Sequence, residues 1–162
     1  MRWRALLAGV MLASASTVSF AVTTTTSTFS VQLTITASCI ISSASSLTFA
    51  PSGVIATAIN QTSTVQVQCT NTTPFNIGLN AGTATGATVT TRKMTSGSNT
   101  ISYSLFSNAG MTTNWGQTIG TDTVSSTGTG AAQSFTVYGQ VPAQSTPAPG
   151  AYSDTITVTV TY

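Results

Sequence analysis

The run YSDTITVTVTY at residues 152–162 decides the fold class. Apolar side chains alternate with threonines along it, at Ile156, Val158, Val160 and Tyr162. Because successive side chains of a β-strand point to opposite faces, this pattern predicts a strand with one buried and one solvated face. The sequence supplies no further strand after it. We therefore expect a sheet whose last strand either pairs with an earlier segment or leaves an edge open to another chain.

Period-two alternation recurs upstream and predicts about eight short strands. The clearest example is an N-terminal run that carries Phe29, Val31, Leu33 and Ile35 on one face. Other expected strands are 47–49, 62–70, 75–79, 88–94, 101–105 and 135–141, whereas 42–46, 107–130 and 142–150 are expected loops. Helical periodicity nowhere exceeds a turn or two. This spacing of short strands and turns favours an all-β sandwich.

The first 21 residues are typical of a secretory signal peptide. Arg2 and Arg4 precede an apolar core at 5–13 that is too short to span a membrane, and Ser19 and Ala21 fit cleavage after Ala21. Removing this peptide leaves 141 residues with two cationic and two anionic side chains, so the net charge is zero. A neutral chain lacks the basic surface that nucleic acids and anionic membranes require. We expect neither partner, and no membrane span in the mature chain.

Cysteine and histidine usage narrows the chemistry. Cys39 and Cys69 are the two cysteines of this exported chain, and an oxidising compartment favours a disulfide between them. Closing a loop of about 30 residues would stabilise the fold by roughly 3–4 kcal/mol. The chain has no histidine and no glutamate, which excludes Ser-His-Asp and Cys-His catalysis, and it has no glycine-rich phosphate-binding motif. The sequence predicts no enzymatic activity, no cofactor and no metal site.

A few polar and aromatic side chains have alternative interpretations. The pair Arg92 and Lys93 is expected at a solvated strand end, with a partner contact as the less favoured alternative. Tyr103 and Trp115 are expected to anchor the core or a loop, although they could form a sugar-stacking pair. Asp154 precedes the last strand, where a turn-forming role is expected.

The threonines of the last strand form a ladder at Thr155, Thr157, Thr159 and Thr161. Regular threonine arrays can match ice lattices in some β-structured antifreeze proteins. The other strands have no comparable ladder, and threonine is a good β-former on any solvated face. Ice binding is therefore the less favoured interpretation.

A series of short motifs runs through nearly all of the mature chain in a fixed order. It comprises the alternating segment before Cys39, LTF at 47–49, VQCT at 67–70, RKM at 92–94, ISYSLF at 101–106, WG at 115–116, VYG at 137–139, and the ending GAYSDTITVTVTY at 150–162. With these motifs the chain resembles the spore coat protein U domain family, which includes pilin subunits of archaic (Csu-type) chaperone–usher pili. One departure is Ala50, where family members usually have glycine.

The resemblance implies an incomplete immunoglobulin-like β-sandwich that lacks its final strand. In such pili the N-terminal extension of one subunit completes the next by donor-strand complementation. A periplasmic chaperone fills the gap before assembly, and an outer-membrane usher catalyses the exchange. Transferred to this sequence, residues 22–36 form the donor extension and residues 37–162 the sandwich. The donor side chains are Phe29, Val31, Leu33 and Ile35, and the edge strand of the acceptor groove carries Ile156, Val158, Val160 and Tyr162.

The expected function is a structural subunit of a cell-surface pilus, exported through the periplasm and supporting adhesion and biofilm formation. Its length suits a shaft or minor pilin better than a tip adhesin. Burying four donor side chains at about 1.5–3 kcal/mol each gives on the order of 6–12 kcal/mol before ordering costs. Two alternatives remain open. The N-terminal strand could fold back in cis, or the chain could be a self-contained secreted spore-coat or matrix protein.

Overall fold

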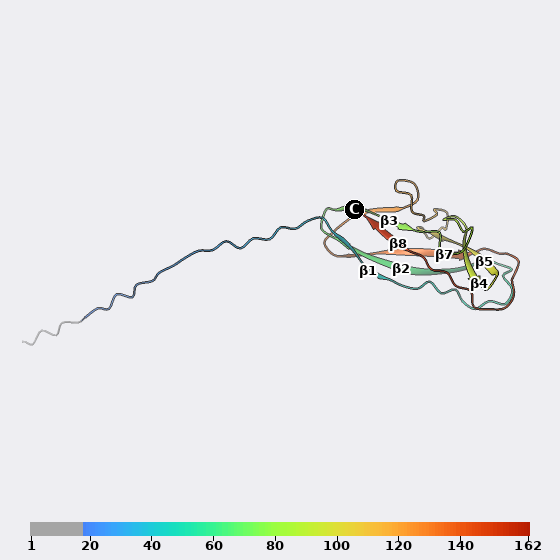
Figure 1. Cartoon of the computed structure of the whole chain (residues 1–162), viewed down its shortest axis with the longest axis horizontal. Coiled ribbons are helices and arrows are strands. Elements are labelled where there is room, and N and C mark those ends of the chain that lie inside the picture. The colour runs from blue at the N-terminus through green and yellow to red at the C-terminus, as the bar shows by residue number, and fades with distance from the viewer. Residues whose placement is uncertain (1–17) are drawn as a thin grey trace, which may run out of the picture. The chain divides into compact units, whose positions relative to one another are not determined.

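Eight β-strands make up the secondary structure of residues 18–162, the part of the chain that a computed structural model describes (Figure 1). The prediction of a signal peptide falls largely on residues 1–17, which lie outside the described residues. The chain divides into two units, Met1–Thr34 and Ile35–Tyr162, and all eight strands belong to the second. No helix occurs between residues 18 and 162, so none there could cross a membrane. The predicted all-β class is confirmed.

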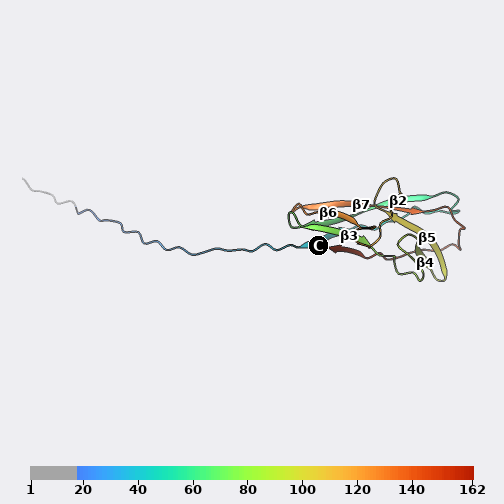
Figure 2. The ribbon, with the colours of Figure 1, turned by 90° about the horizontal axis from the view of Figure 1, so that it is seen from above.

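The strands form two antiparallel sheets. The larger sheet has the order β1-β2-β7-β5-β4, and its members are β1 (Cys39–Ala44), β2 (Ile59–Cys69), β7 (Ala132–Val141), β5 (Asn99–Phe106) and β4 (Arg92–Ser96). The smaller sheet has the order β6-β3-β8, with β6 (Val124–Thr127), β3 (Pro74–Leu79) and β8 (Val158–Thr161). Buried side chains from both sheets form one core, as expected for a β-sandwich. Figure 2 shows the ribbon of the two sheets from above.

The alternation of apolar and polar residues explains which side chains of the central strands are buried. In β2 the side chains of Val65, Val67 and Cys69 point inward, and in β7 those of Val137 and Val141 do so. These two strands pair along ten residues, which makes them the longest ladder of the described sandwich. The expectation that apolar positions with period two mark the core is confirmed here.

The predicted disulfide is present. Cys39 opens β1 and lies directly opposite Cys69, the last residue of β2, and a disulfide joins them. The bond therefore closes the end of the sandwich at which β1 starts.

Several strand boundaries differ from those expected. Residues 42–44 continue β1, residues 88–91 precede β4, and β6 lies inside the expected loop 107–130. The expected strand at 47–49 is absent. Residues 42–44 and β6 are mostly polar, so their backbone pairing leaves no apolar alternation in the sequence. Leu47 and Phe49 do alternate with Thr48, but three residues are too short a pattern to specify a strand.

Candidate functional site

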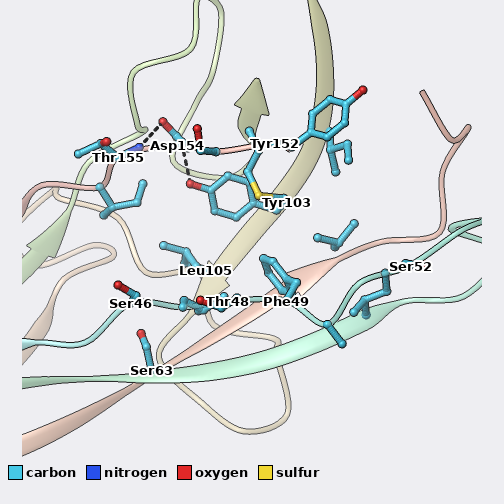
Figure 3. Close-up of a pocket in the computed structure, with 18 of the residues that line it drawn as sticks. Ser46, Thr48, Phe49, Ser52, Ser63, Tyr103, Leu105, Tyr152, Asp154 and Thr155 are labelled. Carbon is cyan, nitrogen blue, oxygen red and sulfur yellow. Dashed lines mark hydrogen bonds between the residues drawn. The ribbon is translucent and has the colours of Figure 1, made fainter. Parts of the chain in front are cut away.

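A groove of about 900 Å³ opens between the two sheets (Figure 3). Most of its apolar lining comes from β2, β3, β5, β7 and β8, and Ala44 of β1 and Met94 of β4 add to it. Representative lining side chains are Val65, Leu79, Leu105, Val137, Val141 and Val158. These residues belong to the core or pack against it, so the groove is a gap in the sandwich interior. An apolar gap of this kind favours an apolar occupant.

One wall of the groove is an irregular segment that contains Leu47 and Phe49. Gly139 of β7 makes room for it, because a Cβ atom at Gly139 would lie 2.6 Å from Cδ1 of Leu47. Phe49 meets the ring of Tyr103 edge-on, with 6.5 Å between ring centroids. Leu47 and Phe49 thus hold this segment by packing, without the backbone ladder that the sequence pattern predicted.

The opposite wall is the edge of the smaller sheet. In the described chain β8 pairs only with β3, so its second edge carries backbone groups without a strand partner. Ile156 and Val158 line the groove, and Val160 packs against the core. Tyr162 is 59% exposed and lies outside the groove lining. The structure thus brings Ile156 and Val158 of the predicted acceptor edge to the groove itself.

A polar cluster holds the start of this edge in place. The Tyr103 hydroxyl donates a hydrogen bond to Oδ2 of Asp154 over 2.7 Å, as the close-up shows (Figure 3). The backbone N–H of Thr83 and its hydroxyl donate to Oδ1 of Asp154 at 2.8 and 2.9 Å, and the N–H of Thr155 donates at 2.8 Å. Burial, followed by the hydrogen bond to Asp154, raises the pKa of Tyr103, so the phenol remains a donor.

Asp154 therefore does more than form a turn. The bond from Thr155 fits the turn role expected from sequence, but the bonds from Tyr103 and Thr83 connect residues 51 and 71 positions apart. Gly82 lies against the carboxylate with a φ of 87°, where a Cβ atom would collide with it. No pattern in the sequence pointed to this cluster.

The model of the Spore Coat Protein U domain family matches residues 25–159. This chain belongs to the spore coat protein U domain family. No curated protein matches it.

One solved structure with a similar fold contains a pilus subunit. This chain is 23% identical to a chain in the crystal structure of the CsuC–CsuE chaperone–tip adhesion subunit pre-assembly complex of archaic Csu pili from Acinetobacter baumannii, with a TM-score of 0.59. The match covers 80% of this chain and 41% of that one, which shows the fold. A chaperone–tip adhesin complex of CFA/I fimbriae biogenesis matches at 16% identity with a TM-score of 0.39, over 77% and 41% of the chains. A TM-score this low does not show a shared fold.

The fold is an incomplete immunoglobulin-like β-sandwich, as the resemblance implied. It has the sheets of a sandwich, a groove that reaches the core, and an edge strand on the smaller sheet beside that groove. No strand pairing of the described chain includes residues 22–36.

The four predicted donor side chains are exposed. Phe29, Val31, Leu33 and Ile35 are 72–88% exposed, and their segment has an irregular backbone in the single chain. A lone strand leaves its backbone N–H and C=O groups without partners, which explains why alternation alone does not produce a ladder. The role of these residues stays a prediction.

Arg92 corrects the expectation for the charged pair. It was expected at a solvated strand end or in a partner contact, yet it is fully buried. Its guanidinium donates to the carbonyl oxygens of Leu79 (2.9 Å), Asn80 (2.8 Å), Val89 (2.7 Å) and Trp115 (2.7 Å). Burial lowers its pKa, but the ordinary value of an arginine is so high that the group stays charged. Arg92 thus links β4 to the end of β3.

Trp115 is a core anchor, as expected. It is 1% exposed, and its indole N–H donates to the carbonyl oxygen of Ile77 at 2.8 Å. Tyr103 is also buried, which leaves no exposed pair for sugar stacking. Among residues 18–162 no cluster of three or more metal-ligating side chains occurs.

Proposed function

We propose that this chain is a structural subunit of an extracellular chaperone–usher pilus and that its copies join by donor-strand complementation. The observation that carries the proposal is that one chain has both an unfilled apolar groove and an exposed apolar segment. The sandwich has an open apolar groove beside a free strand edge, while four apolar side chains at alternate positions stay exposed in the N-terminal segment. Segment 22–36 of a second copy supplies what the groove lacks.

The donor segment is as long as an ordinary β-strand. Residues 29–35 in strand conformation span about 23 Å, at about 3.3 Å per residue. Alternate side chains of such a strand point to one face, so Phe29, Val31, Leu33 and Ile35 would enter the groove together. Their burial contributes on the order of 6–12 kcal/mol before ordering costs.

Backbone hydrogen bonds complete the contact. The second edge of β8 has N–H and C=O groups without a strand partner in the described chain, and an incoming strand can pair with them. This contact joins unlike surfaces of two copies, the donor segment of one and the groove of the other. Such a head-to-tail contact is open-ended and produces a fibre.

The proposal includes the partners and the location that this assembly requires. The signal peptide at 1–21 directs export, a periplasmic chaperone covers the groove before assembly, and an outer-membrane usher catalyses the exchange. The fibre then stands on the cell surface and supports adhesion and biofilm formation. The family match at 25–159 and the fold shared with a chain of a chaperone–pilus subunit complex support this assignment. No enzymatic role is proposed.

A self-completed subunit tests the proposal. Residues 22–36 are removed from the N-terminus and joined after Tyr162 through a short flexible linker. We expect a soluble monomer that unfolds cooperatively at a temperature independent of protein concentration, whereas the mature chain gives a ladder on unboiled SDS gels.

The control carries serine at Phe29, Val31, Leu33 and Ile35 of the transplanted segment. It keeps the chain length and the backbone but loses the apolar side chains, so we expect a lower unfolding temperature. Equal stability of the two fusions would show that the segment does not fill the groove. A mature chain that stays monomeric with or without residues 22–35 would instead indicate a self-contained surface protein.

A further inference from the structure

Ser38 is fixed where the N-terminal segment joins the sandwich. Its backbone N–H donates to the hydroxyl of Thr70 at 3.1 Å, and its carbonyl oxygen accepts from the N–H of Thr70 at 2.9 Å. The next residue, Cys39, forms the disulfide with Cys69. We refer to these two hydrogen bonds and the disulfide as the Ser38 clamp.

Thr70, which binds Ser38 in the clamp, is itself held by neighbouring residues. The hydroxyls of Thr70 and Thr73 are 2.6 Å apart in a hydrogen bond, and the N–H of Thr73 donates to the carbonyl oxygen of Thr70 at 3.2 Å. Gly128 lies so close that a Cβ atom there would collide with the Thr70 carbonyl oxygen. The clamp is therefore anchored to the turn that connects β2 with β3.

The clamp lies at the end of the sandwich where β8 finishes. β3 begins at Pro74, four residues after Thr70, and its residue Asn76 pairs with Thr161. Figures 1 and 2 likewise show the C-terminus close to the start of β1. A chain that filled its own groove would have to leave Ser38, reverse its direction, and return alongside β8.

Only two residues are available for that reversal. Thr36 and Ala37 lie between Ile35, the last donor side chain, and the clamped Ser38. Two-residue reversals between antiparallel strands use type I′ or II′ turns, which need positive φ and therefore favour glycine, asparagine or aspartate. A β-branched threonine followed by alanine is a poor sequence for either turn. A longer reversal would have to break the bonds of Ser38, and then the disulfide.

From this geometry we infer that the Ser38 clamp keeps the groove closed to the chain's own N-terminal segment and reserves it for the segment of a second copy. The inference rests on the proposed function, and it answers whether the donor strand acts in cis or in trans. It also gives the disulfide a role in assembly. Once Cys39 is joined to Cys69, the reversal is confined to Thr36 and Ala37, whereas reduction would let Ser38, Cys39 and Ile40 take part in it.

A turn-forming variant tests the inference. T36N/A37G places an Asn-Gly pair, the strongest two-residue hairpin signal, at the two positions where reversal is needed. The control T25N/T26G introduces the same pair upstream of the donor residues. All chains are used in their mature form, refolded with the disulfide intact at one protein concentration, and separated by size.

We expect T36N/A37G to lower the polymer fraction at least tenfold relative to the wild type and the control. The monomer that replaces the polymer should unfold cooperatively and should not bind a fluorescent peptide of residues 22–36. Refolding of C39S/C69S should also increase closed monomer, through the longer loop that it permits. Since this variant keeps Thr36 and Ala37, it tests the clamp independently of the turn.

Equal polymer fractions in T36N/A37G and T25N/T26G would overturn the inference, as would a wild-type monomer whose groove is already closed to the peptide. A different result would refute the proposed function. If polymers persist when serine replaces Phe29, Val31, Leu33 and Ile35, the donor segment is not what joins the copies, whatever the turn variants do.

Discussion

Truncating one donor side chain should shorten the lifetime of the subunit contact. Leu33 is 85% exposed in the single chain, so nearly all of its surface would leave water on entering the groove of a neighbour. Replacing a buried leucine by alanine costs about 2–5 kcal/mol. At about 1.4 kcal/mol per factor of ten, and with the loss expressed mainly in the off-rate, L33A should dissociate about 30- to 4,000-fold faster.

The assay mixes preformed polymer with an excess of unlabelled peptide of residues 22–36 and follows the release of fluorescently labelled subunits. Gln32→Ala is the matched control, because Gln32 lies on the opposite face of the same strand and its side chain should stay in water. We expect Q32A to dissociate within threefold of the wild type. Equal dissociation rates for L33A and Q32A would refute the assignment of Leu33 to the groove.

Three further predictions concern the stability of the sandwich. Arg92→Leu leaves four carbonyl oxygens, two of them in buried hydrogen bonds, without their donor and should lower the free energy of unfolding by on the order of 3–5 kcal/mol in urea titrations. Tyr103→Phe removes the donor to Asp154 and should cost about 1–2 kcal/mol. Because the folded state raises the pKa of Tyr103, wild-type stability should fall above about pH 10, and Y103F should lose less over that range. C39S/C69S should lose about 3–4 kcal/mol relative to the oxidised wild type, and the reduced wild type should match the variant.

The sequence predicted those strands whose inward side chains are apolar. β2, β3, β5 and β7 follow the period-two pattern closely, because their alternation results directly from burying one face. β6 was missed, since only Val124 among its four residues is apolar and the strand exists through backbone pairing with β3. A strand of that kind leaves almost no side-chain signal.

The site was predictable in part. Alternation identified Ile156 and Val158, which line the groove, but it also included Tyr162, which is largely exposed. The position of Leu47 depends on its contact with Gly139, a residue 92 positions away, and no local pattern records such a contact.

Arg92 shows a different limit of sequence reasoning. Charged side chains are rarely buried, so an exposed position was the reasonable expectation. Its four carbonyl acceptors come from three segments that only the fold brings together. One sign that Arg92 is buried was present in the sequence. Arg92 lies two residues before Met94, so both side chains point to the same face of the strand, and the side chain of Met94 lines the groove.

A photo-crosslinking measurement tests the central claim most directly. A photoreactive amino acid replaces Leu33 in the mature chain, and polymer is assembled from an equal mixture of ¹⁴N- and ¹⁵N-labelled copies. Mass spectrometry of the irradiated polymer then identifies the crosslinked peptides. We predict crosslinks to groove residues such as Leu105, Val137 and Ile156, in peptide pairs that combine both isotopes. Crosslinks confined to single-isotope pairs, or to the outer faces of the sheets, would contradict the account.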